Sequence, residues 1–247
     1  MDRRRFLTLG AASAIGLVGR SSRAFASPRR QSSAQSDIPF GESRLEISDN
    51  LRDGTLYVPK SYKDGEPMPL LMMLHGYAGV SQGVRYAFPL AEEFGVIVIA
   101  PESRDVTWGR SAQGFDPDVR YLGAAYRQVT GMLDVDRTHV ALGGQSDGAG
   151  YALSMGLAYG DVFNHLIVLA GGLMTPFRRQ GKPRIFFGHG INDQQMPIDR
   201  TARRFAPQLK EEGYDVTLQE YDGGHGVPLP VVRDAFKWFL AKDTTQK

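Results

Sequence analysis

The sequence predicts a single α/β domain, in which a mostly parallel sheet of about eight strands carries helices on both faces. Short, continuous apolar runs such as residues 69–74 and 96–100 are typical of strands that are buried on both sides. Longer segments between such runs, for example residues 119–133, repeat their apolar side chains at helical spacing. Strands that alternate with helices favour parallel pairing, because each helix returns the chain to the same edge of the sheet.

The predicted elements follow in order along the chain. We expect strands at residues 44–47, 55–58, 69–74, 96–100, 140–143, 166–170, 184–187 and 216–221. We expect helices at residues 87–94, 119–133, 151–155, 201–212 and 231–241. Residues 171–183 alone join the sixth strand to the seventh, which leaves little room for a cap domain. We therefore expect an open site without a lid.

Residues 1–26 have the three-part layout of a signal peptide. Three arginines at residues 3–5 precede an apolar run at residues 6–19, and Ala24-Phe25-Ala26 fits a cleavage site. The apolar run is shorter than the ~20 residues that a membrane-spanning helix needs. We therefore expect an exported protein, periplasmic or secreted, with no stable membrane anchor once this segment is removed.

The route of export is indicated by residues 2–8, which resemble the bacterial twin-arginine motif. Asp2 and Thr8 depart from that motif at its two ends. The next segment, residues 27–40, begins rich in Ser, Gln and Arg, and we expect it to be a flexible linker. Residues 41–247 are then the folded domain.

The composition excludes several classes of function. The chain has no cysteine, so it has no disulfide, no thiolate nucleophile and no cysteine-ligated metal. Its net charge of +2 arises in the predicted signal peptide, which holds five of the 29 basic side chains and one of the 27 acidic ones. The remainder is close to neutral and gives no footprint for nucleic acid. The sequence also lacks a phosphate loop, an H-E-x-x-H pair and a dinucleotide fingerprint, so we expect neither a cofactor nor a metal.

A single serine lies between a predicted strand and a predicted helix, in Gly-Gln-Ser-Asp-Gly at residues 144–148. The pattern G-x-S-x-G at a strand-to-helix turn is typical of a nucleophile elbow, which holds the serine hydroxyl exposed above the sheet. Glycines suit the flanking positions, because larger side chains would crowd so tight a turn. We therefore predict that Ser146 is a catalytic nucleophile.

A serine hydroxyl needs a base, and around such an elbow the partners follow in the order serine, acid, histidine. His225 lies in a glycine-rich loop after the last predicted strand, and Asp193 follows the strand at residues 184–187. We therefore predict His225 as the base and Asp193 as the acid that orients it, with Asp222 as the second candidate for the acid. His189 precedes the acid, so it is out of order for the base. We expect structural roles for the remaining histidines, His75, His139 and His165.

The oxyanion that develops during acyl transfer needs backbone donors. One expected donor is the N–H of Asp147, which follows the nucleophile, and the other is the N–H of Tyr77 in the loop after residues 69–74. The long loop at residues 101–116 carries Trp108 and Phe115. We expect these two aromatic side chains either to line an acyl or alcohol pocket or to anchor the loop by packing.

Together these motifs resemble the α/β-hydrolase superfamily, in particular the bacterial serine esterases of the phospholipase/carboxylesterase type. The resemblance spans residues 51–240 and is carried by four segments, at residues 74–76, 144–149, 188–197 and 223–225. Secreted polyhydroxyalkanoate depolymerases and feruloyl esterases are also similar. One departure is Asp147-Gly148-Ala149, where many relatives have Gln-Gly-Gly.

The resemblance implies hydrolysis of small or soluble carboxylic esters or thioesters through an acyl-enzyme on Ser146. Three alternatives stay open on the sequence. A polyester or feruloyl ester depolymerase and an acyltransferase would use the same three residues. A noncatalytic binding protein would keep the fold without the chemistry, because a fold does not fix a function.

Overall fold

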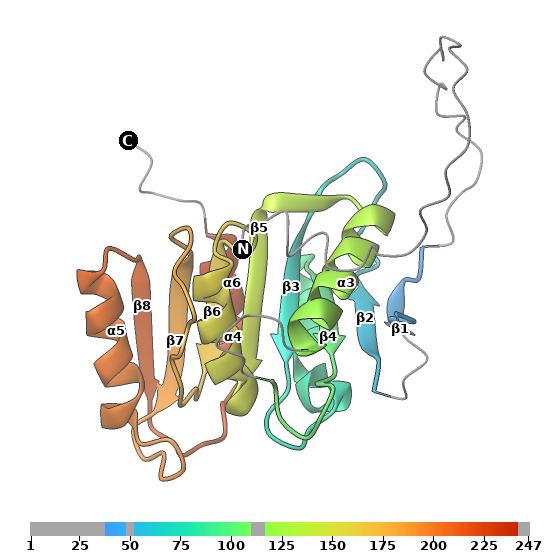
Figure 1. Cartoon of the computed structure of the whole chain (residues 1–247). Coiled ribbons are helices and arrows are strands. Elements are labelled where there is room, and N and C mark those ends of the chain that lie inside the picture. Colours follow the sequence, from blue (N-terminus) through green and yellow to red (C-terminus); the bar gives the residue numbers. More distant parts are fainter. Residues whose placement is uncertain (1–37, 48–51, 110–116, 242–247) are drawn as a thin grey trace, which may run out of the picture.

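The centre of the molecule is an eight-stranded sheet (Figure 1). The structure is a computed structural model that describes residues 38–47, 52–109 and 117–241 of the 247. Its strands are β1 (Gly41–Arg44), β2 (Gly54–Val58), β3 (Met68–Leu74), β4 (Ile97–Pro101), β5 (Val135–Gln145), β6 (His165–Leu169), β7 (Arg184–Gly190) and β8 (Val216–Tyr221). Its helices are η1 (Ser81–Ala87), α2 (Phe88–Phe94), α3 (Pro117–Met132), α4 (Asp147–Ala158), η2 (Ile198–Arg200), α5 (Ala202–Glu211) and α6 (Leu229–Leu240).

The strands lie in the order β1-β2-β4-β3-β5-β6-β7-β8. β2 runs antiparallel to both β1 and β4, and all other neighbours pair in parallel. The prediction of a mostly parallel sheet is confirmed. Because β3 to β8 run in one direction, their carboxyl ends meet at one edge, toward which the strand arrows point at the bottom of Figure 1. We call this the carboxyl edge.

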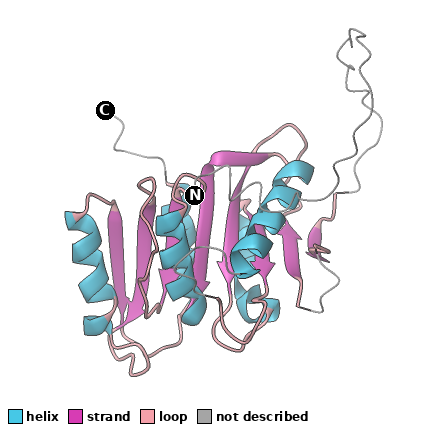
Figure 2. Cartoon of the chain, viewed as in Figure 1, coloured by secondary structure: helices cyan, strands magenta, loops and turns pink. Residues whose placement is uncertain are grey.

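Helices cover both faces of the sheet, as predicted (Figure 2). Alternate side chains of β3 serve the two faces, since Leu70 and Met72 belong to one buried cluster and Leu71 and Met73 to the other. The first cluster includes side chains of α3, α4 and α5, and the second includes side chains of η1, α2 and α6. The side chains of β3 therefore pack alternately against the helices on one face of the sheet and those on the other.

Local sequence explains where some helices begin and end. α2 carries Pro89 in its first turn, where the missing N–H costs nothing, and it ends at Gly95, whose φ of 65° is left-handed. α6 likewise has Pro230 in its first turn. The connection between β6 and β7 is described throughout and holds no helix, so no cap domain is built there.

Several predicted boundaries were wrong. The first strand is β1, at Gly41–Arg44 instead of residues 44–47, because its register is fixed by pairing with β2, from Gly41 opposite Val58 to Arg44 opposite Thr55. β5 begins at Val135, five residues earlier than expected, because Val135 pairs with Met68 across an irregularity in β3. The short helix η1 was not expected at all.

The predicted signal peptide and residues 27–37 of the predicted linker lie outside the described residues. Phe40, at the end of that linker, forms an isolated bridge with Val58. Within the described part of the chain, no helix has both the length and the hydropathy to cross a membrane.

Candidate active site

Ser146 stands in a strained turn between β5 and α4. Its backbone has φ 56° and ψ −118°, a conformation that side-chain-bearing residues rarely adopt. Two hydrogen bonds hold it there. The Ser146 N–H donates to the carbonyl of Leu169 at the end of β6 (2.9 Å), and its carbonyl accepts the N–H of Gly150 in α4 (3.1 Å). The strained residue is thereby fixed at the carboxyl edge of the sheet.

Gly144 and Gly148 are required because other backbone atoms lie too close to leave room for a side chain. A Cβ at Gly144 would lie 2.5 Å from the carbonyl carbon of Gly148, and a Cβ at Gly148 would lie 2.3 Å from the carbonyl oxygen of His75. Real side chains do not tolerate such contacts with backbone. The same packing brings the end of β3 to the serine, since a Cβ at Gly76 would lie 3.6 Å from the Cβ of Ser146.

The structure brings the three predicted triad residues together. Nε2 of His225 lies 2.7 Å from Oγ of Ser146, and Nδ1 of His225 lies 2.8 Å from Oδ2 of Asp193. The Asp193 carboxylate is buried, whereas the His225 ring is partly exposed. The three side chains come from the loops after β5, β7 and β8, so the parallel strands place them at one edge.

The loop after β7 keeps Asp193 ionised. Burial alone would raise the pKa of the Asp193 carboxyl, but the Met196 N–H bond, the His225 contact and the Gln195 N–H bond outweigh it and hold that pKa below its usual value. Both N–H groups lie 2.9 Å from Oδ1, which leaves Oδ2 for His225. An ionised Asp193 requires a proton on Nδ1 of His225, so Nε2 is free to accept the proton of the Ser146 hydroxyl.

His189 lies against the same carboxylate. Its buried Nε2 is 2.7 Å from the carbonyl oxygen of Met196 and 3.3 Å from Oδ2 of Asp193. Burial lowers the pKa of His189, so the ring is neutral and its Nε2–H donates to Met196. His189 therefore supports the loop that carries the acid, while His225 makes the contact with Ser146.

Asp222, the second candidate for the acid, has a different partner. Its Oδ1 accepts a hydrogen bond from Nδ2 of Asn192 at 3.0 Å, and the N–H of Asn192 donates to the carbonyl of Gly223 at the same distance. These bonds tie the loop of Asp193 to the loop of His225. The carboxylate at Nδ1 of His225 is that of Asp193.

The predicted oxyanion donors belong to the two segments that meet at Ser146, the start of α4 and the turn that begins at Gly76. Asp147 is the first residue of α4, where N–H groups have no carbonyl partner within the helix. Tyr77 lies in a tight turn closed by a 3.0 Å bond from the N–H of Gly79 to the carbonyl of Gly76. The third residue of this turn, Ala78, has the strained φ of 52°. We call residues 76–79 the oxyanion turn.

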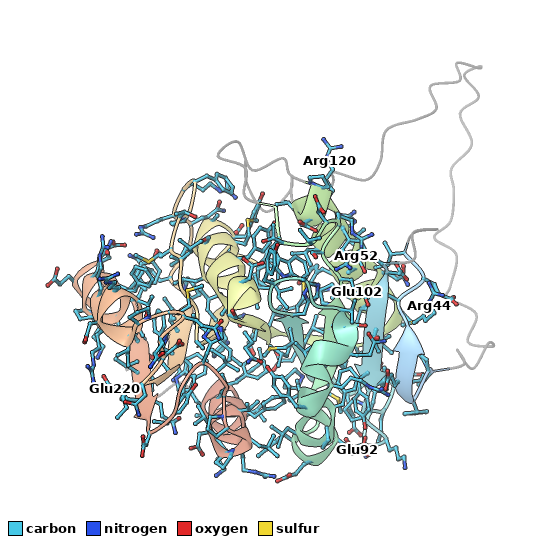
Figure 3. All side chains as sticks on the ribbon, turned by 90° about the horizontal axis from the view of Figure 1, so that it is seen from below. Arg44, Arg52, Glu92, Glu102, Arg120 and Glu220 are labelled. Carbon is cyan, nitrogen blue, oxygen red and sulfur yellow. The ribbon has the colours of Figure 1, made fainter. Side chains whose placement is uncertain are left out.

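Buried and partly buried polar side chains hydrogen-bond to the oxyanion turn. The N–H of Ser103 donates to Nε2 of His75 (3.0 Å), so the proton of His75 is on Nδ1, which donates to the carbonyl of Gly76 (2.7 Å). Burial lowers the pKa of His75, which favours this neutral form. Arg52 donates to the carbonyl of Gly79 (2.8 Å). Arg52 also donates to the carbonyl of Ser103 (2.7 Å), the neighbour of Glu102, and Figure 3, which looks onto the carboxyl edge, labels both Arg52 and Glu102.

Trp108 corrects the predicted pocket. Its side chain is 1% exposed, its Nε1 donates to the carbonyl of His75 (2.9 Å), and its ring packs against His75 and Tyr151. A ring this buried cannot line an open pocket. Trp108 instead anchors its loop by packing. Phe115, the other predicted pocket residue, lies outside the described residues.

Other apolar side chains, which are exposed, follow the strands at the carboxyl edge. In the described part of the chain, most exposed large apolar side chains follow the carboxyl end of a parallel strand, namely Tyr77, Val80, Val106, Leu173, Ile191 and Leu229. We call these six residues the apolar rim. Leu173 is close to the elbow, because a Cβ at Gly150 in the first turn of α4 would lie 3.2 Å from the Cβ of Leu173. Leu173 therefore places exposed apolar surface beside the elbow.

A hollow of about 490 Å³ lies elsewhere, between β1, β2 and α2. Its lining includes Tyr57 and Phe88, which stack on each other, and Glu92, which accepts a hydrogen bond from the Tyr57 hydroxyl at 2.9 Å. Burial and the Glu92 carboxylate raise the pKa of Tyr57 to about 12, so the phenol stays a donor. None of Ser146, Asp193 and His225 lines this hollow. Figure 3 shows Glu92, which lines the hollow, well apart from Arg52 and Glu102. The described residues also contain no cluster of acidic and histidine side chains that fits a metal ion.

No known family model matches the sequence. Solved structures are similar over most of the chain. Esterase PE8 is 20% identical, with a TM-score of 0.63 over 76% of this chain and 98% of that protein. Thermogutta terrifontis esterase 2, solved as phosphonylated by cyclosarin, is 17% identical, with a TM-score of 0.64 over 81% and 92%. Acetyl xylan esterase from Aspergillus awamori is 17% identical, with a TM-score of 0.61 over 81% and 98%. The chain has the α/β-hydrolase fold. At such low identity the α/β-hydrolase likeness gives the architecture, and the chemistry has to be argued from the site.

Sequence reasoning missed three supporting residues of this site. The departure at Asp147 signalled that something was unusual, but not that its carboxylate binds Thr107 in another loop. His189 was noted only as out of order, although its place four residues before Asp193 put it within reach of the acid. Arg52 carried no signal, since a lone arginine before a strand is normally solvated.

Proposed function

We propose that this protein is a serine hydrolase that cleaves carboxylic esters through an acyl-enzyme on Ser146. The observation that carries the proposal is the continuous chain of contacts from Oγ of Ser146 through both ring nitrogens of His225 to the buried carboxylate of Asp193. A strained serine, a base within hydrogen-bond distance and an acid that orients the base are the parts that nucleophilic acyl transfer needs. The likeness to proteins named as esterases supports the same chemistry.

In the first half of the proposed reaction, the ester transfers its acyl group to Ser146. Oγ of Ser146 attacks the ester carbonyl carbon while its proton moves to Nε2 of His225, and the carbonyl π electrons move onto oxygen. The resulting oxyanion accepts hydrogen bonds from the N–H groups of Tyr77 and Asp147. The ionised Asp193 stabilises the imidazolium at Nδ1.

The second half regenerates the enzyme. The tetrahedral intermediate collapses, the bond to the alcohol oxygen breaks, and Nε2 of His225 returns its proton to that oxygen. Water then attacks the acyl-enzyme, with His225 again taking and returning one proton. The products are one carboxylic acid and one alcohol, and Ser146 recovers its hydroxyl.

The surroundings of Ser146 favour small esters with apolar groups. The apolar rim offers contact to an acyl or alkyl chain, and each methylene that is buried contributes ~0.8 kcal/mol. The β6–β7 connection holds no helix, so only the first few methylenes gain that cover. We therefore propose dissolved esters of short to medium chain length as the substrate class.

Two measurements on residues 27–247 test the proposal. A panel of p-nitrophenyl esters of rising chain length should give saturating hydrolysis by the wild type and none by Ser146→Ala. A fluorophosphonate probe should label Ser146, identified by peptide mass spectrometry, and only in the folded protein. If neither ester turnover nor labelling is found, the protein is a binding protein on this fold. Adding an alcohol acceptor and measuring transesterification would separate a hydrolase from an acyltransferase.

A further inference from the structure

The loop after β4 touches both sides of the oxyanion site with three successive residues. The carbonyl of Val106 accepts the N–H of Ala78 in the oxyanion turn at 2.7 Å. Oγ1 of Thr107 donates to Oδ2 of Asp147 at 2.7 Å, and the N–H of Trp108 donates to the same oxygen at 3.3 Å. One short segment therefore binds the turn that carries Tyr77 and the side chain of the residue after the nucleophile.

The Trp108 side chain fixes this segment to the sheet. Its indole Nε1–H donates to the carbonyl of His75, the last residue before the oxyanion turn, at 2.9 Å. The same carbonyl oxygen is the atom that a side chain at position 148 would strike. Segment, turn and elbow are thus packed in mutual contact, and a shift in one has to move the others.

The backbone on both sides of the oxyanion site is strained. Ser146 has φ 56° and Ala78 has φ 52°, and neither is glycine. Conformations of this kind persist only when the surrounding contacts hold them. The hydrogen bonds that residues 106–108 make with Ala78 and Asp147 therefore help to hold this strained backbone in place.

We propose that Val106–Trp108 acts as a brace that sets the separation of the two oxyanion donors, and that the Asp147 carboxylate is the positioning residue through which the brace holds the elbow. This inference rests on the proposed ester hydrolysis. The carboxylate acts as a hydrogen-bond acceptor. The negative charge of this carboxylate would destabilise a nearby oxyanion. The hydrogen bonds from Thr107 and Trp108 orient the carboxylate toward the brace.

The role as acceptor separates two substitutions at Asp147. Asp147→Asn keeps an oxygen that accepts from both Thr107 and Trp108, whereas Asp147→Ala removes it. Misplaced oxyanion donors slow the chemical step more than substrate binding, so Asp147→Ala should lower kcat on the order of tenfold with little change in KM. Asp147→Asn should lose less.

Thr107 supplies a matched pair of variants. Thr107→Ser keeps the hydroxyl donor and Thr107→Val removes it at nearly the same volume, so Thr107→Val should show the larger fall in kcat. Because both changes break the same bond, the double variant Asp147→Ala with Thr107→Val should lose less than the product of the two single losses.

Two further measurements distinguish positioning from general instability. Binding of an alkylboronic acid, whose tetrahedral adduct with Ser146 puts an oxygen at the oxyanion site, should weaken by the same factor as kcat. In a Trp238→Phe background Trp108 is the tryptophan left in the chain, and its emission should shift to the red in Asp147→Ala as the brace loosens. Urea unfolding midpoints within error of the wild type would show that the fold is intact.

The possible outcomes are distinct. An inactive wild type that no fluorophosphonate labels overturns the proposed function itself. An active wild type with Asp147→Ala and Thr107→Val at wild-type kcat overturns the brace. Higher kcat in both Asp147→Ala and Asp147→Asn also overturns it, because the carboxylate would then act only through its charge. Equal losses in Asp147→Asn and Asp147→Ala overturn the acceptor role.

Discussion

Oγ of Ser146 lies 2.7 Å from Nε2 of His225, although 79 residues separate them in the chain. Parallel strands make this meeting possible, because the loops after β5 and β8 end at the same edge of the sheet. The His225 loop is secured through Asn192 and Asp222 to the loop of Asp193, so the base and the acid are positioned together.

The first prediction concerns the relative weight of the three triad residues. Ser146→Ala and His225→Ala should each lower kcat for a p-nitrophenyl ester by about 10⁴-fold or more, because each removes a reacting group. Asp193→Asn should leave more activity, since the serine and the base remain while the tautomer of His225 is wrong. Steady-state kinetics on the purified variants measure this order. Near wild-type turnover by Ser146→Ala would falsify the nucleophile assignment.

The second prediction concerns stability at mildly acidic pH. Burial lowers the pKa of both His75 and His189 below the ordinary 6.5. Below pH 6.5 the unfolded chain therefore binds protons that the folded protein does not yet bind. The free energy of unfolding should fall as pH falls, by up to ~1.4 kcal/mol per pH unit for each histidine, until the folded pKa is reached.

Urea unfolding between pH 7.5 and pH 4.5 measures this slope. His189→Gln keeps an N–H donor toward the carbonyl of Met196 but does not titrate, so its stability should depend less on pH over that range. A slope identical to that of the wild type would mean that His189 contributes no proton uptake on unfolding.

Much of the architecture could be predicted because burial leaves a pattern in the sequence. β3 and β4 are covered on both faces, and their apolar runs marked them to within one residue at each end. β1 is a half-exposed edge strand, and only its pairing with β2 decides where it begins. The start of β5 could not be predicted from an apolar run, because residues 136–139 are polar and only partly buried or exposed. The second half of the same strand is buried in the core.

The triad residues could be predicted from the sequence, whereas the residues that support them could not. Ser146, Asp193 and His225 follow a chain order that reflects the order of the strands, so a single sequence was enough to single them out. The Thr107–Asp147 bond joins side chains 40 residues apart on different loops, and such a bond has no local pattern. Trp108 was ambiguous, because an aromatic residue in a loop is compatible with packing and with pocket lining until its burial is known.

The third prediction tests the apolar rim. Leu173→Ser should raise KM for a hexanoate ester more than for acetate, since a longer acyl chain has more methylenes to bury against Leu173. Met132→Ser is the matched control, because Met132 is also exposed but ends α3 just before β5 begins, and so lies toward the opposite edge of the sheet from Ser146. An equal change of KM for acetate and hexanoate would mean that acyl chains do not reach Leu173.

The fourth prediction concerns export, which only the sequence indicates. Replacing Arg3 and Arg4 with lysine should leave the precursor in the cytoplasm of a bacterial host with a twin-arginine pathway. Replacing Arg20 and Arg23 with lysine is the control and should leave export intact. Normal export of the Arg3/Arg4 variant would point to the general secretory route, and a mature N-terminus other than Ser27 would displace the cleavage site.

The last prediction concerns the response to an oil–water interface. The β6–β7 connection holds no helix, and the described residues around Ser146 form a rim of loops, so nothing there has to move before a substrate enters. The rate on a short-chain triglyceride should therefore follow ordinary saturation and pass smoothly through the solubility limit. Chain-length preference should flatten or fall beyond the first few methylenes, because the rim covers no more of them. Titration of released acid at concentrations on both sides of that limit gives the test. A sharp rise in rate when droplets form would show that a loop acts as a lid.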